Sequence, residues 1–241
     1  MIEPFAGSAA VFMNTEYKRV LLADTNADLI HLYRLLKEES AEFINYASKL
    51  FTPEYNEAEQ YYAFRAEFNA SKNPRRKSAL FIYLNRHGYN GLCRYNAKGG
   101  YNVPFGRYKK PYFPAIEMQE FSRKSKNAEF KIADFREVMR AAKVGDVVYC
   151  DPPYVPLSKT SNFTSYGAKL FGEAEQKELA ELAKELSARG VPVIISNHDT
   201  DFTRAIYADA KLTHFDVQRF ISSNGKNRGR ARELLAVFKA N

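Results

Sequence analysis

Four consecutive residues, Asp151-Pro152-Pro153-Tyr154, combine a carboxylate, two prolines and an aromatic ring. They directly follow the apolar residues 147–150, which we predict to be a strand, and open α/β sheets bind ligands at the carboxyl ends of their strands. Because the prolines make the turn rigid, its carbonyl groups and the Asp151 carboxylate are expected to point toward one place. The turn therefore offers a pair of hydrogen-bond acceptors to an exocyclic amine, which has a pair of N–H bonds to donate.

The chemistry that such a turn suits is activation of an aromatic amine. The amine of adenine is a poor nucleophile because its lone pair is delocalised into the ring. Acceptors that take both protons in tetrahedral geometry favour the localised, nucleophilic form. We therefore predict that Asp151, Pro152, Pro153 and Tyr154 are catalytic, with Tyr154 stacked on the base. The competing interpretation is a stiff strand-to-loop turn with an exposed tyrosine.

A second candidate site lies near the start of the chain. Phe5-Ala6-Gly7-Ser8-Ala9 has the pattern of a strand-loop-helix junction whose small side chains permit close approach of the backbone to a ligand. Asp24 ends the next predicted strand, where its carboxylate could accept hydrogen bonds from ribose hydroxyls. Most loops with few glycines pack against the protein and bind no ligand. We predict a binding role for this loop because the Asp151 turn follows it in the same chain.

The elements that would position these residues alternate along the chain. Strands are predicted at residues 2–5, 20–24, 129–133, 147–150 and 192–196. Helices are predicted at residues 28–38 and 173–188, the second closed by Gly190. Residues 211–218 and 232–239, separated by the turn-forming residues 222–225, are predicted to form an antiparallel hairpin. This pattern predicts an α/β fold with a doubly wound, mostly parallel sheet.

The middle of the chain, residues 53–114, interrupts this alternation. It carries two helical patterns and then residues 85–112, which are rich in Asn, Gly, Tyr and Arg and suit a surface that stacks and hydrogen-bonds. We predict an inserted, largely helical domain at 53–114, between a cofactor-binding part of the catalytic domain at 1–52 and its remainder at 115–241.

The composition favours a polyanionic partner. The formal charge is +8, the pI is about 9.3, and basic residues cluster at 75–77, 107–110, 123–126 and 226–232. A solvated surface is the alternative for any single cluster. Because the chain shows neither an apolar run long enough for a membrane span nor a signal-peptide pattern, we expect a cytoplasmic protein without a membrane association. Cys93 and Cys150 suggest no disulfide and no metal site.

Taken in order, these motifs resemble the group α amino-methyltransferases, and within them the Dam family of adenine-N6 DNA methyltransferases. The resemblance extends from Glu3 to about Lys239. It rests on residues 3–7, 22–26, 85–96, 102–108, 151–154, 195–199 and 222–225. It implies the fold of S-adenosylmethionine-dependent methyltransferases, S-adenosyl-L-methionine as the cofactor, and methylation of a flipped-out adenine in GATC sites of double-stranded DNA. A nucleoid-associated monomer is the simplest expectation.

The resemblance also implies roles for individual residues. Tyr89 would wedge into the base stack, Asn90 would support the space left by the adenine, and Arg94 would bind a guanine edge, while apolar groups would contact bases. The implied DNA-binding residues are Tyr89, Asn90, Leu92, Arg94, Asn96, Pro104 and Arg107. The implied cofactor-binding residues are Glu3, Pro4, Phe5, Ala6, Gly7, Ser8, Asp24, Asn26, Asp134, Phe135 and Asp151.

The sequence departs from the family pattern at two places. Ala9 stands where the family usually has a second glycine. Family members also carry a longer segment ahead of the Glu-Pro-Phe motif, with a Trp-containing stretch that helps to hold the cofactor, and this chain has no Trp. One alternative is therefore a catalytically silent GATC-binding protein. A third interpretation, methylation of a protein glutamine, a cytosine or an RNA base, is disfavoured by the Arg- and Tyr-rich insertion.

Overall fold

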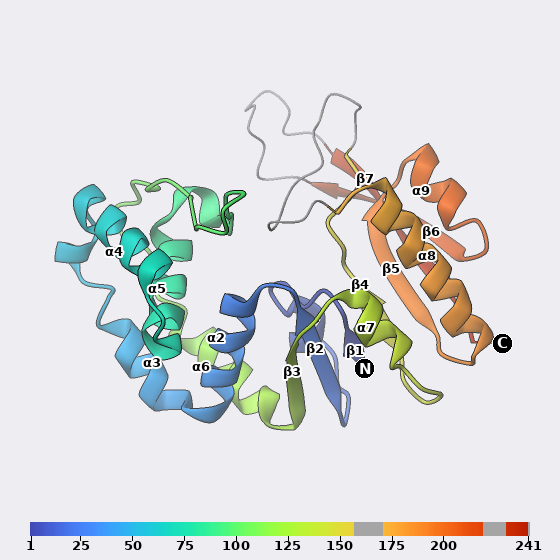
Figure 1. Cartoon of the computed structure of the whole chain (residues 1–241), viewed down its shortest axis with the longest axis horizontal. Coiled ribbons are helices and arrows are strands. Elements are labelled where there is room, and N and C mark those ends of the chain that lie inside the picture. The colour runs from blue at the N-terminus through green and yellow to red at the C-terminus, as the bar shows by residue number, and fades with distance from the viewer. Residues whose placement is uncertain (157–170, 219–229, 241) are drawn as a thin grey trace.

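A mixed sheet organises the chain in the computed structural model, which describes residues 1–156, 171–218 and 230–240. Within these residues seven strands form one sheet in the order β3-β2-β1-β4-β5-β7-β6 (Figure 1). The strands are β1 (Ile2–Glu3), β2 (Val20–Asp24), β3 (Ala128–Ile132), β4 (Val148–Cys150), β5 (Val193–His198), β6 (Lys211–Gln218) and β7 (Arg230–Phe238). Strands β1 to β5 pair in parallel, whereas β7 runs antiparallel to both β5 and β6.

Helices cover both faces of this sheet. They are α1 (Ala10–Met13), α2 (Ala27–Glu38), α3 (Ser40–Ser48), α4 (Ala58–Ala70), α5 (Pro74–His87), α6 (Ala115–Lys124), α7 (Phe135–Arg140), α8 (Glu173–Ala188) and α9 (Asp201–Ile206), with 3-10 turns η1 (Pro53–Tyr55), η2 (Tyr89–Gly91) and η3 (Ser125–Asn127). Figure 1 shows α2 and α6 on one side of the strands, and α7 and α8 on the other.

The alternation of side chains along β2 explains this two-sided cover. Val20 and Leu22 join the core beneath α2, while Ala23 joins the core beneath α7 and α8. Successive residues of a strand face opposite sides, so an apolar strand of this kind is stable only when both faces are buried. The central strands therefore read as nearly continuous apolar runs, as expected for a doubly wound sheet.

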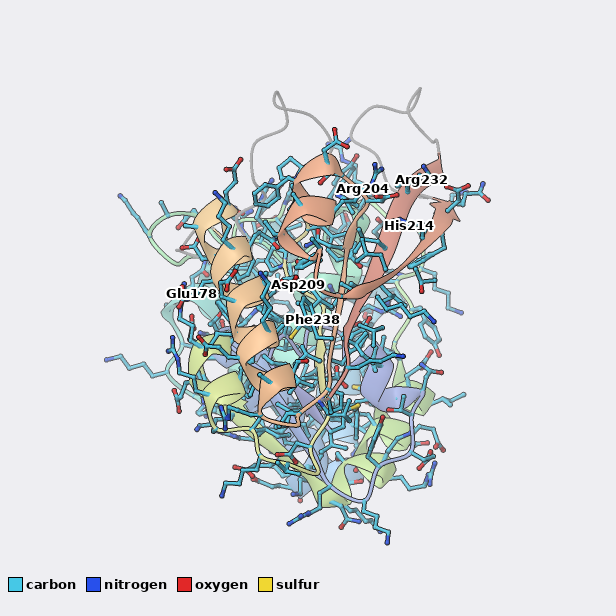
Figure 2. All side chains as sticks on the ribbon, turned by 90° about the vertical axis from the view of Figure 1, so that its right-hand side faces the viewer. Glu178, Arg204, Asp209, His214, Arg232 and Phe238 are labelled. Atoms are coloured by element: carbon cyan, nitrogen blue, oxygen red, sulfur yellow. The ribbon has the colours of Figure 1, made fainter. Side chains whose placement is uncertain are left out.

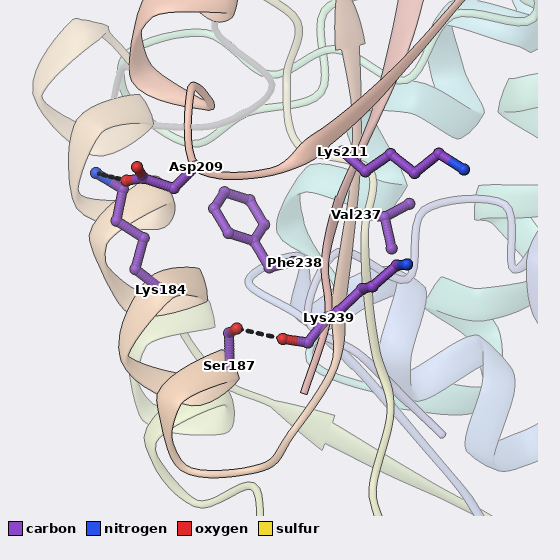
Figure 3. A pocket seen from close by; sticks show the side chains of 7 residues that line it. All are labelled: Lys184, Ser187, Asp209, Lys211, Val237, Phe238 and Lys239. Atoms are coloured by element: carbon purple, nitrogen blue, oxygen red, sulfur yellow. Dashed lines mark hydrogen bonds and ion pairs between the residues drawn. The ribbon is translucent and has the colours of Figure 1, made fainter. Parts of the chain in front are cut away.

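The C-terminal hairpin is fastened to α8 along its side. Ser187 donates from Oγ to the carbonyl of Lys239, and Lys184 pairs with Asp209 at 3.0 Å (Figure 3). The buried ring of Phe238 lies between these two contacts. These interactions hold β7 against β5 at the end of the sheet where the parallel strands begin.

The helical insertion shares one continuous core with α2, α3 and β2. Buried aromatic rings of α4 and α5, such as Tyr61, Phe68 and Tyr83, belong to the same apolar cluster as Leu22. Helices α3, α4 and α5 form the lobe seen at the left of Figure 1. The segment after α5, which was predicted to read DNA, is thus carried on helices that pack against the sheet.

The structure confirms the predicted α/β fold, the mostly parallel sheet and the antiparallel hairpin. Predicted elements at residues 20–24, 173–188 and 211–218 match β2, α8 and β6 residue for residue. Several bounds need correction: the first strand ends at Glu3 and not at residue 5, residues 85–87 end helix α5, and β7 spans residues 230–238 instead of 232–239, while the other predicted strands and helices differ by one or two residues at their ends. The predicted turn at 222–225 lies outside the described residues. In the part of the chain that the structure describes, no helix is long and apolar enough to cross a membrane.

Candidate active site

Three carboxylates lie at the carboxyl ends of three adjacent strands. Glu3 ends β1, Asp24 ends β2, and Asp151 directly follows β4. Because these strands are parallel neighbours, their ends meet at one edge of the sheet. The sequence-predicted catalytic turn and cofactor loop are therefore brought together. Their shared edge is rich in negative charge and suits a cationic ligand.

Glu3 is the most perturbed of these acids. The residue is only 3% exposed, and its Oε1 atom has no hydrogen-bond partner among the residues that the structure describes. Burial raises the pKa of Glu3 to about 7; the backbone N–H of Phe12 opposes this rise, and the charge of Asp151 adds to it. A buried carboxyl oxygen without a partner is unfavourable unless a ligand supplies a donor. Glu3 therefore marks a position where a cation is expected.

Asp24 braces the loop that follows β1. Its carboxylate oxygens accept hydrogen bonds from the backbone N–H groups of Gly7, at 3.1 Å, and Asn26, at 2.8 Å. Burial raises the pKa of Asp24. The Tyr33 hydroxyl donates to the carbonyl of Gly7 from the other side. The predicted cofactor loop is thus fixed by the carboxylate that was predicted to receive ribose hydroxyls.

The same loop contains an alanine in a conformation that favours glycine. Ala9 has φ of 56° and ψ of 28°, in the left-handed region, and its side chain is fully buried. A left-handed residue with a Cβ costs about 1 kcal/mol or more relative to glycine. The departure from the family glycine is thus a local strain, partly offset by burial of a methyl group.

Aromatic rings flank the loop on the α7 side. The rings of Phe5 and Phe135 stack with centroids 5.3 Å apart, and Phe171 packs edge-on against both at 5.5 Å. Asp134 caps α7 by accepting from the N–H of Arg136 at 2.9 Å, and it also pairs with that guanidinium. Phe5 and Phe135 were predicted cofactor residues, and they form one apolar surface.

The Asp151 turn is supported from β5. Ser196 donates from Oγ to Asp151 Oδ1 at 2.8 Å, and the Asp151 side chain is exposed while Pro152 is buried. The Tyr154 ring lies edge-on to His198, with centroids 4.8 Å apart. Within the described residues, the Pro152 carbonyl accepts no hydrogen bond, while the Asp151 carboxylate also interacts with the Tyr154 hydroxyl. The Pro152 carbonyl is therefore available to a substrate amine, and the exposed Asp151 carboxylate lies beside it.

A buried acid anchors the hairpin beside this turn. Asp199, at 1% side-chain exposure, is hydrogen-bonded by Arg204 at 2.6 Å and His214 at 3.0 Å, with Arg232 at 3.7 Å. Burial opposes ionisation, but the hydrogen bonds of Arg204 and His214 outweigh it and lower the pKa of Asp199. Figure 2 shows the side chains of Arg204, His214 and Arg232 gathered at one end of the hairpin. They keep β6 and β7 in place next to β5.

The predicted DNA-reading segment forms a short hairpin with bridges Gly88–Phe105 and Tyr95–Tyr101. Arg94 is exposed, and its guanidinium is held by Asn102, at 2.7 Å to the side-chain oxygen and 3.2 Å to the carbonyl. An arginine has five N–H donors, so this fixed guanidinium keeps donors for a ligand.

The other predicted DNA-binding residues divide into exposed and structural ones. Tyr89 is 49% exposed, and Pro104 and Arg107 are also exposed. Asn90 is in the left-handed region, and its N–H donates to the Tyr108 hydroxyl at 2.9 Å. By contrast, Leu92 is half-buried, and the Asn96 side chain accepts from the N–H groups of Lys98 and Gly100, which closes the hairpin turn.

Two contacts tie the reading hairpin to the cofactor loop region. Tyr95 donates to Asp28 at 2.9 Å, and Asn26 contacts the Cys93 sulfur at 3.7 Å. Asn26 also caps α2 by accepting from the N–H groups of Asp28 and Leu29. Asn26, a predicted cofactor residue, therefore links Asp24, which braces the predicted cofactor loop, to the segment that was predicted to read DNA.

The structure adds residues that the sequence interpretation missed. Tyr33 and Phe171 support the loop and the aromatic surface, and Ser196 supports Asp151. Nothing in the sequence indicated a site role for Tyr33 or Phe171. A tyrosine in an amphipathic helix and a phenylalanine before a helix are common packing residues. Ser196 lay in a segment that had been singled out without a role.

Comparison with known proteins shows which family this chain resembles. The chain matches the model of D12 class N6 adenine-specific DNA methyltransferases over residues 1–221. The DNA adenine methylase of Escherichia coli (strain K12) is 53% identical over 239 residues, 99% of this chain and 86% of that protein. Those of Serratia marcescens and Vibrio cholerae serotype O1 are 51% and 49% identical, each over 99% of this chain and over 89% and 86% of the relatives. The chain therefore belongs to the D12 class N6 adenine-specific DNA methyltransferase family.

Proposed function

We propose that this protein transfers a methyl group from S-adenosyl-L-methionine to N6 of the adenine in duplex GATC. The observation that carries this proposal is the shared sheet edge, where Glu3, Asp24 and Asp151 end three adjacent strands beside an aromatic surface. Residues 53–114 serve as the DNA-recognition domain of a monomer that acts on the chromosome in the cytoplasm.

The residues at this edge fit the proposed cofactor. S-adenosylmethionine carries a sulfonium and an ammonium group, and when bound it supplies an electrophilic methyl group. Glu3, with its unpartnered Oε1, offers an acceptor and a negative charge to a cation. Gly7 and Ser8 are exposed in a loop of small residues, and the half-buried Phe5 ring, stacked on the buried Phe135, offers an apolar contact for an adenine ring. Glu3 is thus the residue whose burial the cofactor best explains.

The acceptor turn prepares the target amine. The Asp151 carboxylate and the Pro152 carbonyl accept hydrogen bonds from its two N–H groups, which favours the tetrahedral nitrogen with a localised lone pair. Ser196 holds one oxygen of Asp151, so the carboxylate keeps one orientation. The ionised Asp151 also stabilises the positive charge that develops on N6.

The adenine must leave the helix to reach this turn, because a paired amine lies inside the duplex. Tyr89, exposed at the surface of the reading hairpin, is placed to occupy the vacated stack. Tyr154 receives the extruded base by stacking against it, and His198 holds the Tyr154 ring edge-on. The two tyrosines therefore act before and after extrusion.

The enzymatic hypothesis is favoured over a catalytically silent DNA-binding protein. Relatives that are 49–53% identical over 99% of the chain are DNA adenine methylases. The proposal is tested by incubating the protein with tritiated S-adenosylmethionine and a duplex with one GATC site. We expect incorporation into GATC and loss of most incorporation when any one of its base pairs is exchanged. Equal incorporation into all duplexes would refute GATC specificity, and none from a folded sample would refute the activity.

Replacing Arg94 by alanine should relax recognition of one guanine. The guanidinium that Asn102 holds can donate to guanine O6 and N7, so its loss should cost about 1 to 3 kcal/mol against GATC. Competition binding between GATC and singly exchanged duplexes measures this. Arg123→Ala, in an exposed ion pair on α6, should leave discrimination unchanged. A loss for Arg94→Ala that is equal on every sequence would assign Arg94 to phosphate contact.

Replacing Tyr89 by alanine should slow methylation of a paired target more than of a mismatched one. The mismatch already lowers the cost of opening, which amounts to a few kcal/mol for a paired base. Fluorescence of 2-aminopurine at the target position should also rise less than with the wild-type protein. Tyr17→Ala provides the control: Tyr17 is 47% exposed against 49% for Tyr89, and it precedes β2 at the opposite edge of the sheet. Equal slowing on both duplexes would make Tyr89 a packing residue.

A further inference from the structure

A buried amide network lies behind the catalytic turn. Gln176 of α8 is fully buried, and its Nε2 donates to the carbonyl of Pro153 at 2.7 Å. Asn197 of β5 is also fully buried; it donates to Gln176 Oε1 at 3.0 Å and accepts from the N–H of Val155 at 3.1 Å. Tyr207 closes the network, since its hydroxyl lies 3.2 Å from Asn197 Nδ2 and 3.4 Å from Gln176 Oε1.

The backbone fixes the orientation of both amides. Asn197 Oδ1 faces two N–H groups, those of Val155 and His198, so Nδ2 must point toward Gln176. Gln176 therefore presents Oε1 to Asn197 and Nε2 to Pro153. No other assignment leaves these buried groups satisfied, and a buried amide without a partner is costly.

We infer that Gln176 and Asn197 are positioning residues for methyl transfer, which hold the turn from both sides of Tyr154. Gln176 donates to the carbonyl of Pro153, and Asn197 accepts from the N–H of Val155. These two hydrogen bonds restrain the backbone on both sides of Tyr154. The Pro152 carbonyl, which accepts no hydrogen bond within the described residues, is left as an acceptor for the amine. The inference rests on the proposed role of the Asp151 turn.

The geometry explains why such a clamp matters for the rate. An acceptor displaced by about 1 Å from the reacting amine can reduce a rate by as much as about a hundredfold. DNA binding, in contrast, depends on the reading hairpin and on phosphate contacts, which this network does not touch. Loss of the hydrogen bonds from Gln176 and Asn197 should therefore lower the rate of methyl transfer and leave the affinity for DNA nearly unchanged.

The test compares single-turnover methylation with DNA affinity in Gln176→Met, which has a similar size but no donor. We expect its rate to fall at least about tenfold while the dissociation constant for GATC duplex stays within about threefold. Ser125→Ala is the matched control, because it removes another fully buried polar group, whose Oγ donates to the Ser122 carbonyl far from the Asp151 turn in sequence. Its rate should remain within about twofold of wild type.

A second variant ties the rate to the hydrogen bond that residue 176 donates. In Gln176→Glu an ionised carboxylate cannot donate to the Pro153 carbonyl, but a protonated one can, and burial raises the pKa of such a carboxyl. Its rate relative to wild type should therefore recover as the pH falls from about 8 to about 6. If Gln176→Met does not fold, this ratio decides the question.

The inference is overturned if folded Gln176→Met transfers methyl groups within about twofold of wild type, or if the relative rate of Gln176→Glu is independent of pH. An inactive wild-type protein would instead refute the proposed function. The two failures are thus distinguishable in one series of measurements.

Discussion

Replacing Asp151 by alanine should reduce the single-turnover rate of methylation by roughly a thousandfold, because a preorganised charge at the reacting atom is removed. The affinity for GATC duplex should change by less than about threefold, since the carboxylate acts on the amine and not on the duplex. Asp151→Asn should also be severely impaired. Its amide keeps an acceptor oxygen that Ser196 can donate to, but it lacks the charge that stabilises the nitrogen cation.

The matched control is Asp209→Asn, which alters an acid paired with Lys184 on the far side of α8. Its turnover should equal that of wild type. Tritium incorporation after rapid mixing measures the rates, and fluorescence anisotropy measures the affinities. Turnover near the wild-type value in either Asp151 variant would remove this residue from the mechanism.

Replacing Glu3 by glutamine should abolish a pH dependence of cofactor affinity. Wild-type Glu3 has a pKa of about 7, so the ionised form that attracts a cation is minor at pH 6 and dominant at pH 8. Affinity for S-adenosylmethionine should therefore rise by about tenfold over this interval. Calorimetry measures the affinity of wild type and of Glu3→Gln at each pH. The comparison of the two proteins corrects for any titration of S-adenosylmethionine itself. Glu129→Gln, an exposed acid on β3, is the control.

The same substitution should stabilise the protein without ligand at high pH. The pKa of folded Glu3 lies above its ordinary value of 4.5, so folding favours the neutral acid; the stability is complete below about pH 4.5 and is lost as the pH rises through about 7. At pH 8 Glu3→Gln should therefore gain about 2 to 3 kcal/mol, and at pH 5 less than about 1 kcal/mol. Denaturant unfolding measures both. Equal stability of the two proteins at pH 8 would contradict the burial of a charge at this site.

Much of the fold could be predicted because its periodicity is unambiguous. The apolar run 20–24 predicts a strand and the amphipathic repeat 173–188 predicts a helix, and both predictions match the structure. The strand before the cofactor loop is central in the sheet, because β1 lies between β2 and β4. Helix α3 was missed because it follows α2 almost without interruption and its sequence has a weak pattern.

The sequence predicted only those parts of the candidate site whose residue types and positions indicate a chemical role. Asp151, Asp24 and the loop around Gly7 were recognisable because carboxylates and small residues follow predicted strands. That Asp24 braces the loop, that Asn26 caps α2 and that Asn96 closes a turn depend on backbone donors, which sequence spacing does not reveal. The network of Gln176 and Asn197 depends on two elements far apart in sequence, so only their packing shows it.

Nucleoside mass spectrometry tests the central claim most directly. The protein is incubated with a duplex that contains one GATC site and with S-adenosylmethionine whose methyl group is deuterated, and the DNA is then digested to nucleosides. The structure predicts N6-methyldeoxyadenosine that carries the deuterated methyl group, formed by wild type and absent with Asp151→Ala. A labelled methyl group on cytosine or on the protein itself, or equal formation of the adenine product by Asp151→Ala, would contradict the account.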